Sequence, residues 1–186
     1  MEKIDVLEKI LLADNVEKSL KENEATIFEM IPLLQYEKDF DQKSEWHAYD
    51  VWNHTIKAVA SSEKDFDIRL VMLLHDIGKP FSYQEDGDIR HFHGHANKSM
   101  ELSEGILTQL GYSGEELERM LFLIGAHASQ IEIDKIDDSN RDFYDQLIKI
   151  QIYDASAYEK SHGEMVINRL LEIQEQLKKE KVKSLW

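Results

Sequence analysis

Apolar residues recur at helical spacing along almost the whole chain. In the first such stretch, residues 4–15, Ile4, Leu7, Ile10 and Leu11 share one face, as expected for a helix with one buried side. The same period recurs at residues 23–40, 50–62, 66–78, 97–111, 114–128, 139–159 and 163–183. The pattern predicts an all-α protein, a single bundle of roughly seven or eight helices joined by short loops.

Residues that commonly begin or stop helices mark several of these boundaries. They are Asp65 or Asp67 as a cap for residues 66–78, Ser113 with Glu116 as a capping box for 114–128, Gly111 as the close of 97–111, and Pro32 as a break within 23–40. Residues 83–96 contain turn-forming residues in place of a helical period, which predicts a loop built around Asp86-Gly87-Asp88.

One domain of ordinary size accounts for the 186 residues. Neither a repeat nor a low-complexity linker divides the chain, although a polar connector follows the first helical stretches. We therefore predict a helical extension over residues 1–44, packed on a core domain of residues 45–186. The C-terminal stretch, residues 171–186, is suited either to packing on the core or to pairing in a homodimer.

The formal net charge of −15 at pH 7 limits the partners of this chain. A protein that binds polynucleotides normally presents a basic face to the phosphates, whereas this chain would repel them over most of its surface. We therefore expect no nucleic-acid partner. Any anionic substrate should be a small molecule, or should be attracted by a local positive centre.

Cysteine is absent from the sequence, which excludes disulfides, thiolate metal sites and a cysteine nucleophile. Charges interrupt residues 1–15, unlike the apolar run of a signal peptide. No apolar run approaches the ~20 residues needed to span a bilayer. These observations predict a cytoplasmic protein with no membrane partner.

Four apolar helical stretches each carry an ionisable residue at or near their ends. These residues are His54, His75, His127 and Asp154. Each alone is ordinary, because a single histidine in such a place is more often hydrogen-bonded or exposed than a ligand. Together they are unusual, since burying an unpaired charge costs several kcal/mol. A metal site at the centre of the bundle, with ligands from facing helices, would compensate all four.

The ligand types also suit a metal, because imidazole and carboxylate together favour Fe, Mn, Co, Ni or Zn. Asp76 directly follows His75, and neighbours on a regular helix point about 100° apart. At a helix end before Gly78 this constraint relaxes, so Asp76 could approach the metal from another side or bridge two ions. His95 opens the next helix beside Gly94 and is the best further candidate.

The order of these residues resembles the signature of a known family. His54, His75-Asp76, His95, His127 and Asp154 match the H…HD…H…H…D pattern of the HD-domain metal-dependent phosphohydrolase superfamily. The strings HAYDVWNHT, LLHDIGKP, HFHGHA and YDASA look most like the HD module of bacterial CCA-adding tRNA nucleotidyltransferases and of similar stand-alone proteins. The resemblance covers about residues 46–160 and implies an all-α HD-domain core.

The resemblance also implies two sets of metal ligands. They are His54, His75, Asp76 and Asp154 for a first ion, and His95, His127 and the bridging Asp76 for a second. The implied cofactor is one or two divalent ions of Fe, Mn, Ni, Co or Zn, with Mg as a further option. Lys79 matches a lysine near the substrate phosphate, and we expect Gly78 and Pro80 to end the helix and leave Lys79 free to face that phosphate. Lys79 and Asp76 are the expected catalytic residues.

Four further residues are candidates for binding the substrate or orienting the ligands. They are His47, Asp50, His91 and His93. For Asp50, which stands one turn before His54, a role as the helix cap is an equally good interpretation. His93 is favoured over His91 for contact with the site.

The function implied by the resemblance is hydrolysis of a small phosphate ester, such as a nucleotide or a related phosphomonoester or phosphodiester. Residues 1–44 resemble no nucleotidyltransferase head, so we expect no nucleotide transfer. A non-catalytic HD module that senses a nucleotide or a metal is the alternative. A di-iron oxygenase on the same scaffold is a further one, which the presence of Lys79 disfavours.

Overall fold

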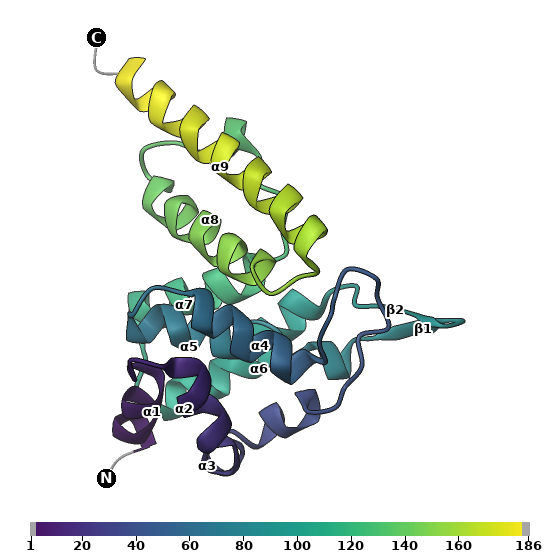
Figure 1. The fold of residues 1–186 in the computed structure, drawn as a ribbon. Helices are drawn as coiled ribbons and strands as arrows, with labels where there is room; N and C mark the ends of the chain where they lie inside the picture. Colours follow the sequence, from purple (N-terminus) through teal and green to yellow (C-terminus); the bar gives the residue numbers. More distant parts are fainter. Residues whose placement is uncertain (1–2, 184–186) are drawn as a thin grey trace.

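A computed structural model describes residues 3–183, which fold almost entirely into helices (Figure 1). The α-helices of this range are α1 (Lys3–Leu11), α2 (Val16–Glu22), α3 (Glu24–Met30), α4 (Val51–Ser61), α5 (Phe66–Leu74), α6 (His95–Gln109), α7 (Gly114–Ala126), α8 (Arg141–Ala155) and α9 (Lys160–Lys183). Short 3-10 helices span Pro32–Glu37 (η1), Lys79–Phe81 (η2) and Ile133–Lys135 (η3). The predicted all-α fold is confirmed. None of the helices within residues 3–183 is both long and apolar enough to cross a membrane.

Helix α5 lies at the centre of the bundle. Its N-terminus is capped by Asp65, whose carboxylate accepts a hydrogen bond from the Ile68 amide at 3.0 Å, as the sequence predicts. Every residue from Ile68 to Leu74 is buried, which is typical of a helix surrounded by other helices. Helices α1, α4, α7 and α8 all pack against it. The C-terminal end of α5 therefore lies inside the protein.

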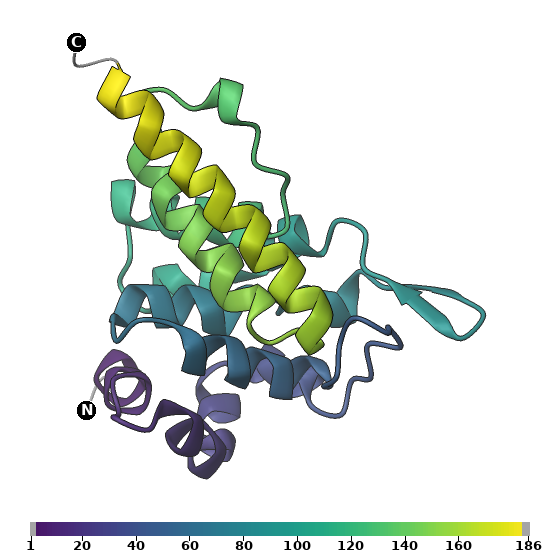
Figure 2. The same ribbon diagram turned by 45° about the horizontal axis from the view of Figure 1, so that its top comes forward.

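The remaining helices pair around this centre. Helix α6 lies along α7, and α9 lies along α8 so that this C-terminal pair covers one side of the bundle (Figures 1 and 2). The C-terminal stretch thus packs on the bundle at least as far as Leu177, which is buried. Residues 184–186 lie outside the described range, and the homodimer stays a prediction.

Gly111 closes α6, as predicted, with a Schellman motif. Its φ of +101° is left-handed, and the amides of Gly111 and Tyr112 bond back to the carbonyls of Thr108 and Leu107, both at 3.1 Å. This sharp end allows α7 to return along α6.

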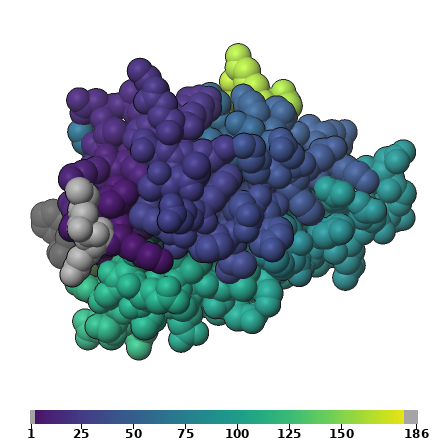
Figure 3. All heavy atoms as spheres, turned by 90° about the horizontal axis from the view of Figure 1, so that it is seen from below, coloured from purple at the N-terminus to yellow at the C-terminus, as the bar shows by residue number. Residues whose placement is uncertain are grey.

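The N-terminal helices lie on the side of the bundle away from α8 and α9 (Figure 1) and form much of the face that is seen from below in Figure 3. Their apolar residues belong to the same hydrophobic core as those of the later helices. In addition, the buried guanidinium of Arg69 in α5 donates to the carbonyl of Leu11 at the end of α1. The division at residues 44 and 45 stays a prediction, because the two parts share one core.

One helix was not predicted, one predicted cap does not form, and one predicted boundary is confirmed. Residues 16–22 form α2, which the sequence did not reveal because only Val16 and Leu20 are buried along it. Ser113 precedes α7, but its side chain makes no capping hydrogen bond in the described structure. Gly114, the first residue of α7, has a φ of +55° and therefore departs from helical backbone geometry. Pro32 ends the preceding helix as predicted, since α3 stops at Met30.

The predicted loop at residues 83–96 contains a small β-hairpin. Strands β1 (Gln84–Asp86) and β2 (Ile89–His91) pair antiparallel, with Glu85 opposite Arg90, around a turn at Gly87. Arg90 Nε lies 2.9 Å from Glu85 Oε1. The strands are three residues long and mostly exposed, so they lack the alternation that marks a half-buried strand. The turn was therefore predictable and the strands were not.

Gly78 allows the segment after α5 to contact α6 closely. A Cβ at this position would lie 2.5 Å from the carbonyl oxygen of His95 and 2.5 Å from the amide nitrogen of Ser99. The Gly78 amide donates to Ser99 Oγ at 2.9 Å. Its φ of −81° is helical, so the prediction that Gly78 stops the helix is wrong. Glycine is needed here for the close approach of two backbones.

Gly78→Ala should therefore reduce the free energy of unfolding by roughly 1–3 kcal/mol, because the methyl group overpacks a backbone contact. Denaturant unfolding measures this change. Gly105→Ala is the matched control within α6, where a Cβ would meet nothing within 4 Å. It should be neutral or stabilising by up to about 1 kcal/mol, and equal stabilities of the two variants would refute the role of Gly78.

Candidate metal centre

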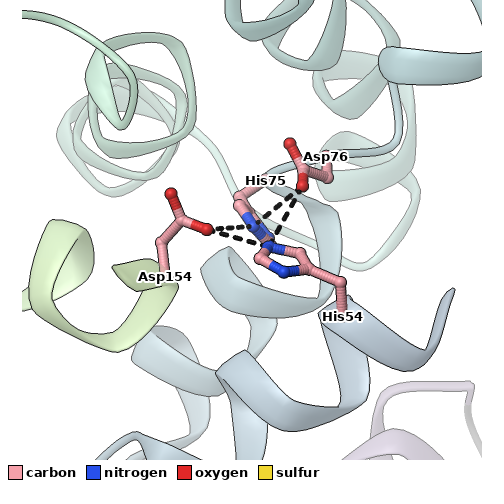
Figure 4. Close-up of side chains that lie close together, drawn as sticks. All are labelled: His54, His75, Asp76 and Asp154. Carbon is pink, nitrogen blue, oxygen red and sulfur yellow. Dashed lines mark hydrogen bonds and ion pairs between the residues drawn. The ribbon is translucent and has the colours of Figure 1, made fainter. Parts of the chain in front are cut away.

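Four buried side chains from three helical segments meet at the inner end of α5 (Figure 4). His54 projects from α4 and Asp154 from α8, while His75 and Asp76 directly follow the last residue of α5. Each of the four is at most 5% exposed. One possible ligand atom from each lies within 4.8 Å of the others, so a single ion could contact all four.

Within this first group, the two imidazoles face the two carboxylates. His54 Nε2 lies 2.8 Å from Asp154 Oδ1 and 3.4 Å from Asp76 Oδ2. His75 Nε2 lies 3.3 Å from Asp76 Oδ2 and 3.4 Å from Asp154 Oδ1. Both histidines therefore use the same ring nitrogen toward the same pair of oxygens.

A second group shares Asp76 with the first. His95 begins α6 and His127 follows α7, and their Nε2 atoms lie 3.4 and 3.5 Å from Asp76 Oδ1. The two Nε2 atoms are 3.1 Å apart, and burial lowers the pKa of His95 to about 4. Asp76 thus directs one carboxylate oxygen at each group, which is the arrangement of a bridging ligand.

Backbone carbonyls determine which nitrogen each histidine presents to the centre. Nδ1 of His75, His95 and His127 lies 2.7 Å from the carbonyl oxygen of the residue three positions earlier. Nδ1 of His54 lies 3.4 Å from the Ala157 carbonyl. A carbonyl only accepts, so Nδ1 carries the proton in these contacts. In the neutral form of a ring held in this way, the lone pair of Nε2 points inward, as it does in metal-binding histidines.

Among the residues that the structure describes, the centre also contains buried polar atoms that lack hydrogen-bond partners. Within residues 3–183, Asp76 Oδ1 and His75 Nε2 are buried without a hydrogen-bond partner, and Asp76 Oδ2 has an ion pair with Lys79 but no hydrogen bond of regular geometry. Burial would raise the pKa of Asp76, but His75 and Lys79 hold it well below its usual range. Burial would likewise lower the pKa of His75, but the carboxylates of Asp76 and Asp154 raise it to about 10. A divalent cation fits this group, because it would satisfy the orphaned atoms and balance the carboxylates.

Lys79 lies against Asp76 and is not free. Its Nζ is 2.7 Å from Asp76 Oδ2, and it donates to Gln42 Oε1 at 2.8 Å. The ring of Phe92 lies 5.5 Å from the same nitrogen, and Lys79 is 4% exposed. The structure thus places the ammonium beside the shared carboxylate, where the sequence had only predicted a position facing the substrate.

Two buried residues near the centre come from the N-terminal segment, and sequence reasoning missed both. Gln42 holds Lys79, as described above. Glu37 accepts a hydrogen bond from Thr55 Oγ1 at 3.0 Å, and burial together with the charge of Asp76 raises its pKa well above the usual value. Gln42 lies in the polar connector, and Glu37 lies among several polar residues near the end of the stretch at 23–40, so neither stands out in the sequence as the histidines do.

Tyr158 was also missed, although the sequence contained a signal for it. Its hydroxyl donates to Asp154 Oδ2 at 2.7 Å, and burial with the nearby Asp154 charge raises the pKa of the phenol well above its usual value. Residues four apart near the end of a helix lie on one side of it. The spacing from Asp154 to Tyr158 therefore predicts the contact once Asp154 is recognised.

The four predicted accessory residues occupy different places. The ring of His47 lies 5.5 Å from that of His54, and burial lowers its pKa to about 3. Asp50 caps α4 by accepting from the Asn53 amide at 2.7 Å, which is the second of its two interpretations. His91 and His93 are exposed and stack on each other at 5.6 Å, and neither belongs to the ligand groups found in the described residues.

Fold and site together define a helical protein with a buried His/Asp group that could hold metal ions. The family model described as "HD domain" matches residues 46–169, which is more than half of the chain. The chain therefore belongs to the HD domain family, and the resemblance that the sequence motifs predict is confirmed.

Two curated relatives match part of the chain. The A-adding tRNA nucleotidyltransferase of Deinococcus radiodurans is 35% identical over 96 residues, which cover 48% of this chain and 22% of the relative. The CC-adding tRNA nucleotidyltransferase of Thermus thermophilus is 30% identical over 92 residues, which cover 46% of this chain and 21% of the relative. The matched segments thus span about a fifth of the length of these relatives.

Ligand substitutions should separate the two groups. Asp76→Ala should remove all bound metal, because its oxygens face both groups, whereas His127→Ala should lower the metal content by one ion per chain at most. Elemental analysis of the purified variants measures this, with circular dichroism as the test of folding. His91→Ala is the matched control, since this exposed histidine lies outside both groups. Full metal content in folded Asp76→Ala would rule out the assignment.

Proposed function

We propose that the protein is a metal-dependent phosphohydrolase acting on a small phosphate ester, such as a nucleotide or a related phosphomonoester or phosphodiester. The observation that carries this proposal is the carboxylate of Asp76, whose two oxygens face separate groups of possible ligands. Paired sites that share a ligand are typical of enzymes that displace phosphate esters in line. Membership of the HD domain family supports the same class of reaction.

In this proposal the ligands divide into two sets around Asp76. The first set adds His54, His75 and Asp154, and the second adds His95 and His127. These donors suit Fe, Mn, Ni, Co or Zn, with Mg as a further option. Bound there, the ions would supply the Lewis acidity that activates a water molecule and neutralises the phosphoryl group. Asp76 would fix both sets relative to each other.

Lys79 adds a fixed positive charge at the same place. Asp76 and Gln42 hold its ammonium within 2.8 Å, so it needs little reorganisation during a reaction. A positive group placed in advance beside a phosphoryl group stabilises the charge that develops there. We therefore propose Lys79 as the residue of this chain that contacts the substrate phosphate or its leaving oxygen.

A cavity of about 260 Å³ adjoins both ligand groups, and we call it the side cavity. The residues that border it include Asp154, His127, Trp46, Tyr158 and His162. Sites that enclose drug-sized ligands usually measure ~300–1,000 Å³, so the side cavity suits a small substrate. The net charge of −15 also disfavours a polynucleotide. We therefore do not extend to this chain the tRNA nucleotidyl transfer for which its relatives are named.

The test of this function is hydrolysis of a chromogenic phosphate ester with added Mn²⁺, Ni²⁺ or Co²⁺. Lys79→Met should lower kcat by roughly 10²-fold or more, as loss of a preorganised charge does. Lys98→Met is the matched control, because Lys98 pairs with Glu101 at 3.0 Å on the surface. Unfolding curves distinguish lost chemistry from the destabilisation expected when a buried ion pair loses one partner.

A negative result would also be informative. If the metal-loaded protein hydrolyses neither the chromogenic ester nor any nucleotide, yet binds a nucleotide tightly, it is a non-catalytic nucleotide- or metal-sensing HD module. Equal activity of wild-type protein with and without a chelator would contradict metal dependence itself.

A further inference from the structure

A stack of aromatic rings connects the candidate metal centre to the surface. Tyr158 stacks on His54 with ring centroids 5.8 Å apart, His162 stacks on Tyr158 at 5.4 Å, and Trp46 stacks on His162 at 4.5 Å. The planes of successive rings differ by only 23°, 23° and 15°. The stack begins at a possible metal ligand and ends at Trp46, which borders the side cavity.

The backbone of Trp46 is held by hydrogen bonds although about half of the residue is exposed. Its amide approaches Ser44 Oγ at 3.3 Å, and its carbonyl accepts a hydrogen bond from the Glu159 amide at 2.9 Å. The residue is nevertheless 52% exposed, while His162 covers one face of the indole. The amide and the carbonyl of Trp46 are both hydrogen-bonded, and its large apolar ring therefore remains available to a ligand in the side cavity.

We propose that Trp46 is a specificity-determining residue, which stacks on a planar ring of the substrate such as the base of a nucleotide. The phosphate of that substrate would lie at the metal centre, so this placement rests on the proposed function. The size of the side cavity suits one ring system. Stacking is tolerant of sequence because every base has a π-face, so Trp46 would select for the presence of a base and not for its identity.

The kinetic test compares two phosphomonoesters that differ in the ring. Adenosine 5′-monophosphate carries a base and ribose 5-phosphate does not, and both are assayed with Mn²⁺. In Trp46→Ala, the ratio of kcat/KM for the nucleotide to that for the sugar phosphate should fall by roughly 5- to 150-fold, as loss of one base–aromatic stack predicts. Most of the change should appear in KM, and Trp46→Phe should restore much of the ratio.

Tyr36→Ala is the matched control for this experiment. Tyr36 is 53% exposed and packs edge-on against Phe81, so it resembles Trp46 in exposure but does not border the side cavity. In Tyr36→Ala, the ratio of kcat/KM for the nucleotide to that for the sugar phosphate should equal the ratio in the wild type. An unchanged ratio in Trp46→Ala would overturn the proposal. An equal loss of kcat/KM with both esters would also overturn it, because it would mean that Trp46 only holds its loop in place by packing against His162.

A binding measurement makes the proposal independent of turnover. Equilibrium dialysis of Mn²⁺-loaded protein gives the Kd of adenosine 5′-monophosphate for the wild type and for Trp46→Ala. A Kd that rises by roughly 5-fold or more supports the stack even if the wild type hydrolyses neither ester, in which case only the proposed function fails. Equal Kd values in the two proteins would refute the stack even if the wild type is an active phosphatase.

Discussion

Two buried carboxylates set the central constraint on this structure. Asp76 and Asp154 lie among apolar helices with at most 5% of their surface exposed, and an uncompensated charge in such a place would be costly. Four imidazoles and one ammonium from separate elements converge on them. The positions of the helix ends, and above all the burial of the C-terminal end of α5, follow from the need to bring these groups together.

The carbonyls at the ends of two helices and the histidine ligands meet each other's need for hydrogen bonds. The last carbonyls of an α-helix have no partner within the helix, and here Met72 in α5 and Ile124 in α7 each accept a hydrogen bond from the histidine that follows the helix. The same bond fixes the tautomer of the ring. One contact therefore completes the helix and prepares the ligand, which explains why His75 and His127 directly follow the ends of α5 and α7.

The sequence predicted the six possible ligands because ionisable residues in apolar periods are rare and their order is specific. It did not predict Glu37 or Gln42, since both come from a segment whose position depends on tertiary packing. The prediction that Gly78 ends the helix is wrong for a related reason. Only the structure shows that the backbone of α6 passes against Gly78. Asp50 illustrates an ambiguity that sequence alone cannot remove. An aspartate one turn before His54 is equally expected for a helix cap and for a residue that orients the ligand.

The amide of Gln42 has a consequence for how relatives of this protein can differ. Gln42 lies outside the matched residues 46–169, yet its oxygen shares the Lys79 ammonium with Asp76. Replacement of this one amide by an acid or an apolar side chain would alter the charge balance at the shared carboxylate and leave every ligand intact. Proteins with identical family motifs can therefore diverge in chemistry through a segment that precedes those motifs.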